Sequence, residues 1–254
     1  MDNGNTMKNV LIVAYIFPPL AGSGVQRTLK FVNYLRSFGW KPIVVTTGQL
    51  NFPQIDFTLV DEIPKDIQVI RINGQDSLTG DDIQNIIKIY DDLIKDKTIL
   101  DDYLTLISGG RAALVPDNCI SWANNVIKQI DTLIDINKID MIYTTSGPYS
   151  DHIVGYYLKK KFNKPWVADF RDEWTNNAYS NVDKQSLLYK VHYGMEETIV
   201  NSADAVIATT PLASDNYATI FDLPKEKVFT ITNGYDEKDF EKIKMENLEI
   251  EHDK

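Results

Sequence analysis

The apolar residues of this chain alternate between short continuous runs and longer stretches with helical spacing. Val10–Tyr15 is a continuous run, and Ala203–Ala208 is interrupted only by Asp204. Such runs are typical of strands buried on both faces of a parallel sheet. Between Val25 and Phe38 the apolar residues recur every three or four positions, as they do on one face of a helix. Because this alternation continues along the chain, the sequence predicts an α/β fold with a doubly wound, mostly parallel, Rossmann-like sheet.

The pattern predicts seven strands with helical stretches between most of them. The strands are expected at 10–15, 42–47, 67–72, 139–143, 165–170, 203–208 and 228–231. The helices are expected at 25–38, 75–107, 120–136, 150–161, 187–200 and 211–221. Within these helices we expect Ile83 and Leu133 to face the core and Asp82 to lie on a solvated face. Ser150 is expected to cap its helix.

One domain is the simplest organisation of these elements. We expect it to span residues 8–236, after a disordered, polar N-terminus at 1–7. Residues 237–254 are charged and poor in apolar residues, so we interpret them as a linker or tail.

Composition and charge narrow the function. The chain has 254 residues, of which 43% are hydrophobic, and a net charge of −10, which argues against nucleic acid as the main partner. The single cysteine, Cys119, excludes an internal disulfide and indicates a reducing, cytoplasmic compartment. Residues 1–7 do not resemble a signal peptide. Peripheral contact with the inner face of a membrane stays open, and Lys159–Lys161 is either the basic patch for it or a favourable helix end.

The stretch after the first predicted strand is a candidate anion site. Pro18 and Pro19 end the strand, and Gly22-Ser23-Gly24 allows backbone angles that side chains forbid, just before the helix begins. Free backbone N–H groups and the positive end of the helix dipole would then point at the same spot. A dinucleotide fold is the competing interpretation, but Arg27 stands where its third glycine belongs, and 42–47 does not end in an acid.

Polar clusters also follow three later strands, and strand ends of a parallel sheet meet at one edge. The clusters are Ser146–His152, Asp169–Asp172 and Asn233-Gly234. His152 falls in the first turn of a helix, where the dipole lowers the pKa of an imidazole and keeps it neutral at pH 7. Asp169 and Arg171 lie two residues apart, so on an extended segment they share a face and could pair with each other or with substrate hydroxyls. No metal-ligand spacing accompanies these residues.

Several of these motifs, taken in order, resemble the retaining "group 1" glycosyltransferases of family 4, which have the GT-B fold. The motifs are Phe17-Pro18-Pro19 with Gly22-Ser23-Gly24 and Arg27, then 145–152, 168–174, 203–210, and 233–236 with Phe240. The resemblance covers nearly the whole chain. It implies an N-terminal, acceptor-side domain, with 237–254 leading towards a missing domain that binds the nucleotide-sugar.

The same resemblance implies roles for individual residues. Gly22, Ser23, Gly24 and Arg27 would approach the donor phosphate or sugar across the cleft. His152 would be catalytic, with Ser146 beside the reacting sugar. Asp169, Arg171 and Asp172 would line the acceptor side, and Asn233 and Gly234 would lie near the hinge. Enzymes of this kind need no catalytic metal or cofactor.

The resemblance therefore implies a hexosyltransferase that moves a sugar from a nucleotide-sugar donor to a glycan or lipid-linked acceptor in surface polysaccharide biosynthesis. Transfer needs donor and acceptor held in a dry cleft between two domains. Because one domain supplies one wall, we expect this chain alone to be inactive. The alternative is a non-catalytic α/β module that binds a sugar or nucleotide.

Overall fold

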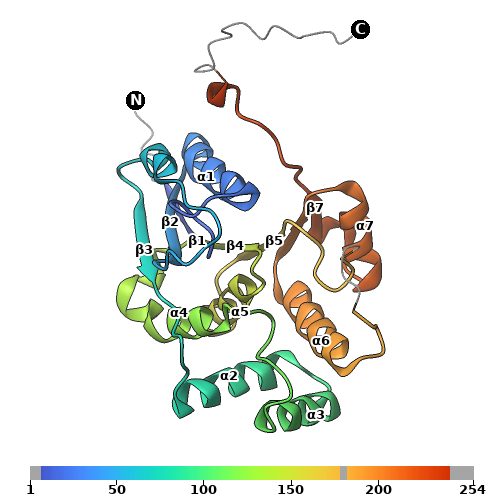
Figure 1. Ribbon diagram of the computed structural model, residues 1–254. Helices are drawn as coiled ribbons and strands as arrows, with labels where there is room; N and C mark the ends of the chain where they lie inside the picture. Colours follow the sequence, from blue (N-terminus) through green and yellow to red (C-terminus); the bar gives the residue numbers. More distant parts are fainter. Residues whose placement is uncertain (1–6, 178–181, 241–254) are drawn as a thin grey trace, which may run out of the picture.

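The computed structural model describes residues 7–177 and 182–240, and its centre is a sheet of seven parallel strands (Figure 1). The strand order is β3-β2-β1-β4-β5-β6-β7. The strands are β1 (Lys8–Val13), β2 (Trp40–Thr47), β3 (Gln68–Ile72), β4 (Met141–Ser146), β5 (Trp166–Phe170), β6 (Ala205–Ala208) and β7 (Val228–Thr230). The predicted α/β, Rossmann-like fold is therefore confirmed.

The helices connect consecutive strands, except between β2 and β3. They are α1 (Ser23–Leu35), α2 (Gly80–Leu93), α3 (Lys97–Ser108), α4 (Ile120–Leu133), α5 (Ser150–Phe162), α6 (Leu187–Ser202) and α7 (Pro211–Ile220). Short 3-10 turns are η1 (Arg36–Phe38), η2 (Phe57–Glu62), η3 (Ile136–Lys138), η4 (Lys225–Lys227) and η5 (Glu237–Asp239). Residues 1–6 and 241–254, where the disordered terminus and most of the tail were predicted, lie outside the described residues.

The order of the strands decides which face each helix covers. Connections between parallel strands are right-handed, and the chain steps one way from β1 to β2 and the other way from β4 to β7. As a result α1 lies on one face, whereas α4, α5 and α6 lie on the other, with α2 and α3 forming a further layer outside them (Figure 1). This arrangement gives a doubly wound sheet with a small core under α1 and a larger one under α4–α6.

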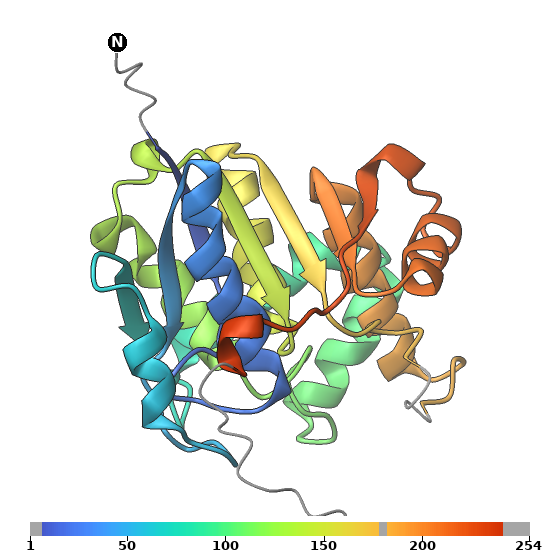
Figure 2. The same cartoon turned by 90° about the horizontal axis from the view of Figure 1, so that it is seen from above.

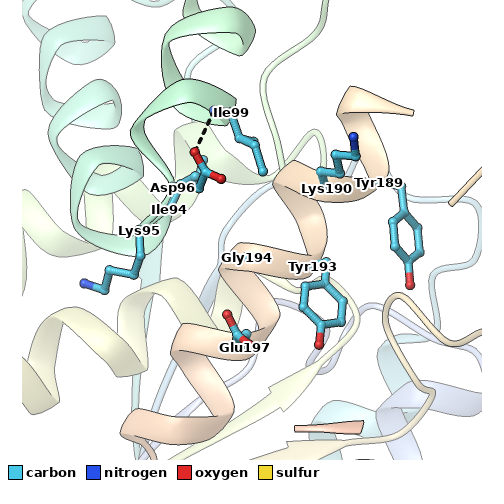
Figure 3. A pocket seen from close by; sticks show the side chains of 9 residues that line it. All are labelled: Ile94, Lys95, Asp96, Ile99, Tyr189, Lys190, Tyr193, Gly194 and Glu197. Atoms are coloured by element: carbon cyan, nitrogen blue, oxygen red, sulfur yellow. Dashed lines mark hydrogen bonds between the residues drawn. The ribbon is translucent and has the colours of Figure 1, made fainter. Parts of the chain in front are cut away.

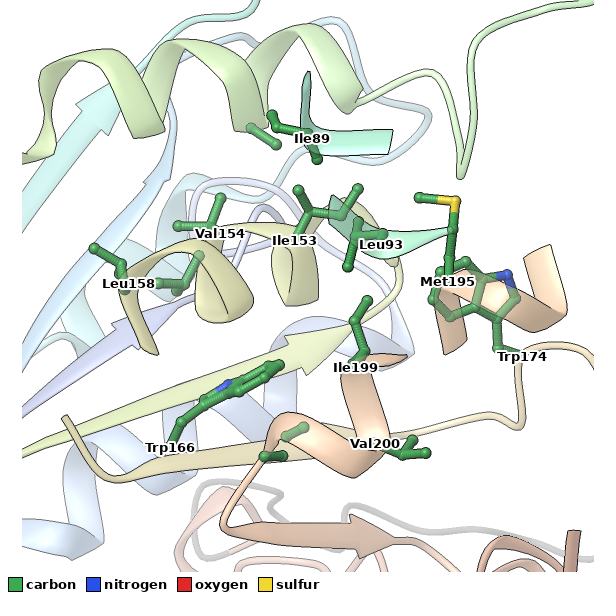
Figure 4. Packing of buried hydrophobic residues seen from close by; sticks show 14 of the residues in the cluster. Ile89, Leu93, Ile153, Val154, Leu158, Trp166, Trp174, Met195, Ile199 and Val200 are labelled. Carbon is green, nitrogen blue, oxygen red and sulfur yellow. The ribbon is translucent and has the colours of Figure 1, made fainter. Parts of the chain in front are cut away.

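The larger core depends on a close approach of α5 to the sheet. Trp166 of β5 is fully buried, and a Cβ atom at Gly155 of α5 would overlap its ring. The glycine therefore lets the helix rest directly on the tryptophan. Figure 4 shows Trp166 beneath Ile153, Val154 and Leu158 of the same helix, with α6 side chains beside them.

The acidic region between β3 and α4 differs from the prediction. It forms two helices, because Asp96 accepts hydrogen bonds from the N–H groups of Thr98 and Ile99 and so begins α3. Asp82 is buried rather than solvated, since it completes a capping box with Thr79 and also accepts bonds from α4. Ile83 is instead 37% exposed, and a helical pattern alone could not show where the capping residue turns the helix.

Two further surface features bear on the predictions. Leu133, at the end of α4, is 41% exposed rather than inward-facing. Lys159, Lys160 and Lys161 each form an ion pair, with Asp204, Asp92 and Asp131 respectively. These lysines therefore do not form a patch of unpaired charge. Across residues 7–177 and 182–240, no helix is both long and apolar enough to cross a bilayer.

Candidate functional site

The candidate site lies where the parallel strands end. All seven strands run the same way, so the segments after β1, β4, β5 and β7 emerge at one edge of the sheet (Figure 2). The four polar clusters of the sequence belong to these segments or to the helices that follow them. The strand directions therefore bring the four clusters to one edge of the sheet, as predicted.

The first wall of the site is the start of α1. Gly22 precedes the helix with φ 111° and ψ 176°, a backbone conformation that in practice only glycine adopts. Among the described residues, no side chain caps the start of α1. Arg71 steadies the loop before it by donating to the carbonyl groups of Pro18 and Thr47. The predicted positive φ is therefore confirmed at Gly22 but not at Gly24.

Gly24 is needed for a different reason, which is the position of Arg171. A Cβ atom at residue 24 would overlap the Arg171 guanidinium, so this glycine lets the cation lie against the first turn of α1. Arg171 donates through Nε to the carbonyl of Ser146 and through Nη2 to the carbonyl of Gly147, 3.0 Å away. Both acceptors are neutral, and within the described chain no carboxylate forms an ion pair with Arg171. A guanidinium beside a helix N-terminus places two positive potentials together, which favours binding of an anion.

Arg27 and Asp169 form a buried ion pair. Of the two expected roles for Asp169 and Arg171, pairing with each other or binding substrate hydroxyls, the first is therefore wrong. Arg27 Nε and Nη2 donate to the two oxygens of Asp169 at 2.7 and 2.9 Å. The hydroxyl groups of Tyr143 and Thr145 donate to the same carboxylate. Arg27 is 7% exposed and Asp169 is 0% exposed. Both carboxylate oxygens accept hydrogen bonds within the protein and the side chain is fully buried, so a substrate hydroxyl cannot reach it in this conformation.

Arg27 also connects the site to the segment that leaves β7. Its Nη1 donates to Asn233 Oδ1 at 3.1 Å and to the carbonyl of Thr232. Beyond this contact, Asp236 and Asp239 pair with Lys30 of α1. A groove of about 1050 Å³ lies between α1 and residues 232–240. Asn233 thus takes part in the site through Arg27, whereas Gly234 is exposed beside it.

His152 is fully buried and does not lie on the surface of its helix. Its Nδ1 lies 2.7 Å from Thr144 Oγ1, and its ring packs against Phe170 with centroids 4.2 Å apart. Burial lowers the pKa of His152 from 6.5 to about 3. The expected neutral ring is therefore confirmed, but desolvation is the cause rather than the helix dipole. Its Nε2 has no hydrogen-bond partner among the described residues.

The other predicted site residues lie around Arg171. The Ser146 side chain is fully buried, and it is the Ser146 carbonyl that contacts the guanidinium. Asp172 is exposed at the next position. Ser23 is the first residue of α1, and its side chain lies outside the described atoms.

The residue that anchors the start of α5 was not among the predicted site residues. Tyr149, not Ser150, precedes the helix. Asp117 accepts hydrogen bonds from the N–H groups of Tyr149 and Ser150 and from the Ser150 hydroxyl. Burial raises the pKa of Asp117. Because Asp117 is 33 residues from Ser150 in the chain, only its position after Pro116 and before a helix could have drawn attention to it.

A second pocket, of about 350 Å³, lies away from the strand ends, between α6 and the link that joins α2 to α3 (Figure 3). Ile94 and Ile99 face it from one side and Gly194 from the other. It shares no residue with the site around Arg171. Among the described residues, no group of three or more His, Cys, Asp or Glu side chains is arranged to hold a metal ion.

Comparison with solved structures identifies the class of fold. Sucrose-phosphate synthase from Thermosynechococcus elongatus aligns with a TM-score of 0.58 at 13% identity, over 91% of this chain and 49% of that one. Medicago truncatula UGT71G1, complexed with UDP-glucose, aligns with a TM-score of 0.50 at 12% identity, over 92% and 53% of the two chains. LpCGTa, in complex with UDP, aligns with a TM-score of 0.50 at 10% identity, over 89% and 54%.

The fold is therefore the Rossmann-like domain found in GT-B glycosyltransferases. At such low identity the similarity establishes the fold alone. The chain spans about half the length of these structures. No protein-family model matches the sequence, and no curated protein matches it either.

Proposed function

We propose that this chain is the N-terminal, acceptor-side domain of a retaining glycosyltransferase of family 4. The whole enzyme would move a hexose from a nucleotide-sugar to a glycan or lipid-linked acceptor in surface polysaccharide biosynthesis, in the cytoplasm. One observation carries the proposal: the Arg171 guanidinium lies against the start of α1, which no described side chain caps, and among the described residues its hydrogen-bond partners are neutral carbonyl groups. The ordered family motifs and the GT-B type of fold support it.

The chemistry of sugar transfer explains why such a site would be useful. When the bond from the anomeric carbon to the donor diphosphate breaks, negative charge grows on the leaving phosphate oxygens. Positive groups fixed in place before the reaction stabilise that charge more than they stabilise the bound donor. Arg171 and the first amides of α1, at Gly22–Gly24, would meet the diphosphate from this domain. The nucleoside would bind to a second domain across the cleft.

Other predicted residues take supporting roles in this proposal. Asp169 and Arg27 hold β5, α1 and the exit segment together, and Asn233 with Gly234 would form the hinge. His152 would contribute to catalysis only indirectly, because its ring is fully buried between Thr144 of β4 and Phe170 of β5. Asp172 is exposed beside Arg171 and would face the acceptor.

The first test compares nucleotides with and without the diphosphate. We expect UDP or GDP to bind the chain at around millimolar affinity, roughly −4 kcal/mol, and uridine or guanosine to bind far more weakly. Titration followed by NMR would measure the difference. Equal binding of nucleoside and diphosphate would contradict the proposed anion site.

The second test concerns transfer itself. The chain alone should release no UDP or GDP from nucleotide-sugars, because one domain offers one wall of the cleft. A fusion to the nucleotide-sugar-binding domain of a GT-B glycosyltransferase should restore release, and Arg171→Ala should abolish it. Diphosphate binding without transfer in any fusion would instead support a non-catalytic sugar- or nucleotide-binding module.

A further inference from the structure

Glu196 is a buried acid of α6 that the proposed transfer does not use. It is 1% exposed. Its Oε2 accepts hydrogen bonds from the N–H of Thr175, at 2.9 Å, and from the Thr175 hydroxyl. Its Oε1 accepts from the Tyr217 hydroxyl at 3.0 Å. Three donors thus converge on one carboxylate, as the burial of a charged group requires, and two of them come from the segment that follows Arg171.

Helix α6 also holds Trp174, the residue before Thr175. Trp174 donates through Nε1 to His192 Nδ1 at 2.9 Å. Its ring stacks on Tyr149, with centroids 4.6 Å apart and planes 8° from parallel. The Tyr149 hydroxyl in turn donates to the carbonyl of Glu173. Residues 173–175 are therefore clamped between α6 and the start of α5.

The contacts of residues 173–175 lie next to the groups that orient Arg171. Tyr149 directly follows the turn whose Ser146 and Gly147 carbonyls hold the guanidinium. Arg171 is itself only four residues before Thr175, and its own carbonyl accepts from Thr209. Contacts thus run from α6 to Thr175 and Trp174 and then to Tyr149. The backbone before Tyr149 carries the Ser146 and Gly147 carbonyls that Arg171 contacts.

We propose that Glu196 is a positioning residue for Arg171, and that its ionised form holds the guanidinium in the geometry that binds an anion. This inference rests on the proposed function only for the identity of the anion, because the position of Arg171 can be measured without any ligand. Glu196 acts through Thr175 and Trp174 and touches no substrate.

The surroundings of Glu196 make this clamp sensitive to protonation. Burial raises the pKa of Glu196 from 4.5 to about 7. The titratable groups that interact with it are Tyr217 from α7, Tyr149 from the start of α5 and Tyr193 from α6. His192 of α6 accepts a hydrogen bond from Trp174, and Asp172 and Glu173 precede Trp174 in the chain. Burial lowers the pKa of His192 to about 4, so this ring stays neutral near pH 7.

Protonation removes acceptor capacity from Glu196. Above its pKa, the carboxylate accepts from all three donors with charge-assisted bonds. Below it, one oxygen carries a proton and the bonds to Thr175 weaken. Anion affinity at Arg171 should therefore fall as the pH is lowered through about 7.

The experiment uses sulfate as the probe, since its charge does not change between about pH 6 and pH 8. Wild-type chain and Glu196→Gln are compared with Glu197→Gln, which makes the same change at the exposed neighbouring position. NMR follows the Arg171 Nε–H signal, assigned by its loss in Arg171→Lys, and sulfate titrations are run at both pH values. Thr175→Val, which removes only the hydroxyl donor, serves as a second variant if Glu196→Gln does not fold.

We expect wild type and Glu197→Gln to bind sulfate roughly fivefold more tightly at pH 8 than at pH 6. In Glu196→Gln the Arg171 signal and the sulfate affinity should match wild type at pH 6 and be independent of pH. A pH-dependent Arg171 signal in Glu196→Gln, equal to that of wild type, would overturn the inference and leave the anion site standing. An Arg171 signal that depends on Glu196 in a chain that binds no sulfate would support the positioning role and overturn the proposed function.

Discussion

Arg27 and Arg171 lie at the same edge of the sheet and have opposite environments. Arg27 is buried, and its charge is neutralised by the Asp169 carboxylate. Arg171 is half-buried and bonds to two neutral carbonyl groups beside a helix N-terminus. The first arrangement holds three chain segments together. The second leaves a positive charge available, so the comparison separates a structural arginine from a candidate functional one.

The largest expected effect is the loss of the buried pair. Asp169→Asn should lower the free energy of unfolding by about 3 to 5 kcal/mol, because it leaves the Arg27 charge buried without its counter-ion. Urea denaturation would measure the change. The exposed Asp172→Asn is the matched control and should change stability by less than about 0.5 kcal/mol. Equal losses in the two variants would show that Asp169 is not a structural partner.

Removing the other arginine should affect binding rather than stability. Arg171→Ala should weaken binding of UDP or GDP by roughly thirtyfold, about 2 kcal/mol, since it removes charge-assisted hydrogen bonds to phosphate. Its unfolding midpoint in urea should stay close to that of wild type. Arg111→Ala, which removes the same charge at an exposed position, should leave both measurements unchanged. A similar loss of binding in Arg111→Ala would show that Arg171 acts only through the net charge of the chain.

The pH dependence of stability tests whether the His152 ring is buried at this edge of the sheet. Its pKa is about 3 in the folded chain and 6.5 ordinarily, so the unfolded chain binds more protons between these values. The stabilisation is full above about pH 6.5 and is lost as the pH falls towards 3. From pH 6 to pH 5 this group should lower stability by roughly 1 kcal/mol. His152→Gln should show a shallower decline, and an unchanged slope would mean that the ring is solvated.

The two glycines at the start of α1 should respond differently to the same substitution. Gly24→Ala adds a Cβ that overlaps the Arg171 guanidinium, so diphosphate affinity should fall roughly tenfold. Its unfolding free energy should hold or rise by up to about 1 kcal/mol, because alanine is the better helix former. Gly22→Ala should instead lose about 1 to 2 kcal/mol of stability, since alanine is strained at φ 111°. Melting curves and diphosphate titrations of both variants would measure these effects. A larger loss of stability in Gly24→Ala than in Gly22→Ala would contradict the prediction.

The architecture can be predicted from the pattern of apolar and polar residues along the chain. Continuous apolar runs and helical spacing specified seven strands and the regions of the helices, because each element must bury one face or both. Polar clusters at the strand ends then located the edge that carries the site. The expectation that Gly22 takes a positive φ also followed from local chemistry alone.

The partners of each charged group, in contrast, depend on which elements the fold brings together. Asp169 is 142 residues from Arg27 in the chain and two residues from Arg171, yet it binds Arg27. His152 sits in a first helical turn but is buried, and Asp82 lies under α4 rather than in solvent. Periodicity is a local property, whereas an ion pair depends on which elements the sheet brings side by side. For that reason the chain alone could name Arg27 and Arg171 as candidates, and the folded molecule shows that Arg27 is the one paired with a carboxylate.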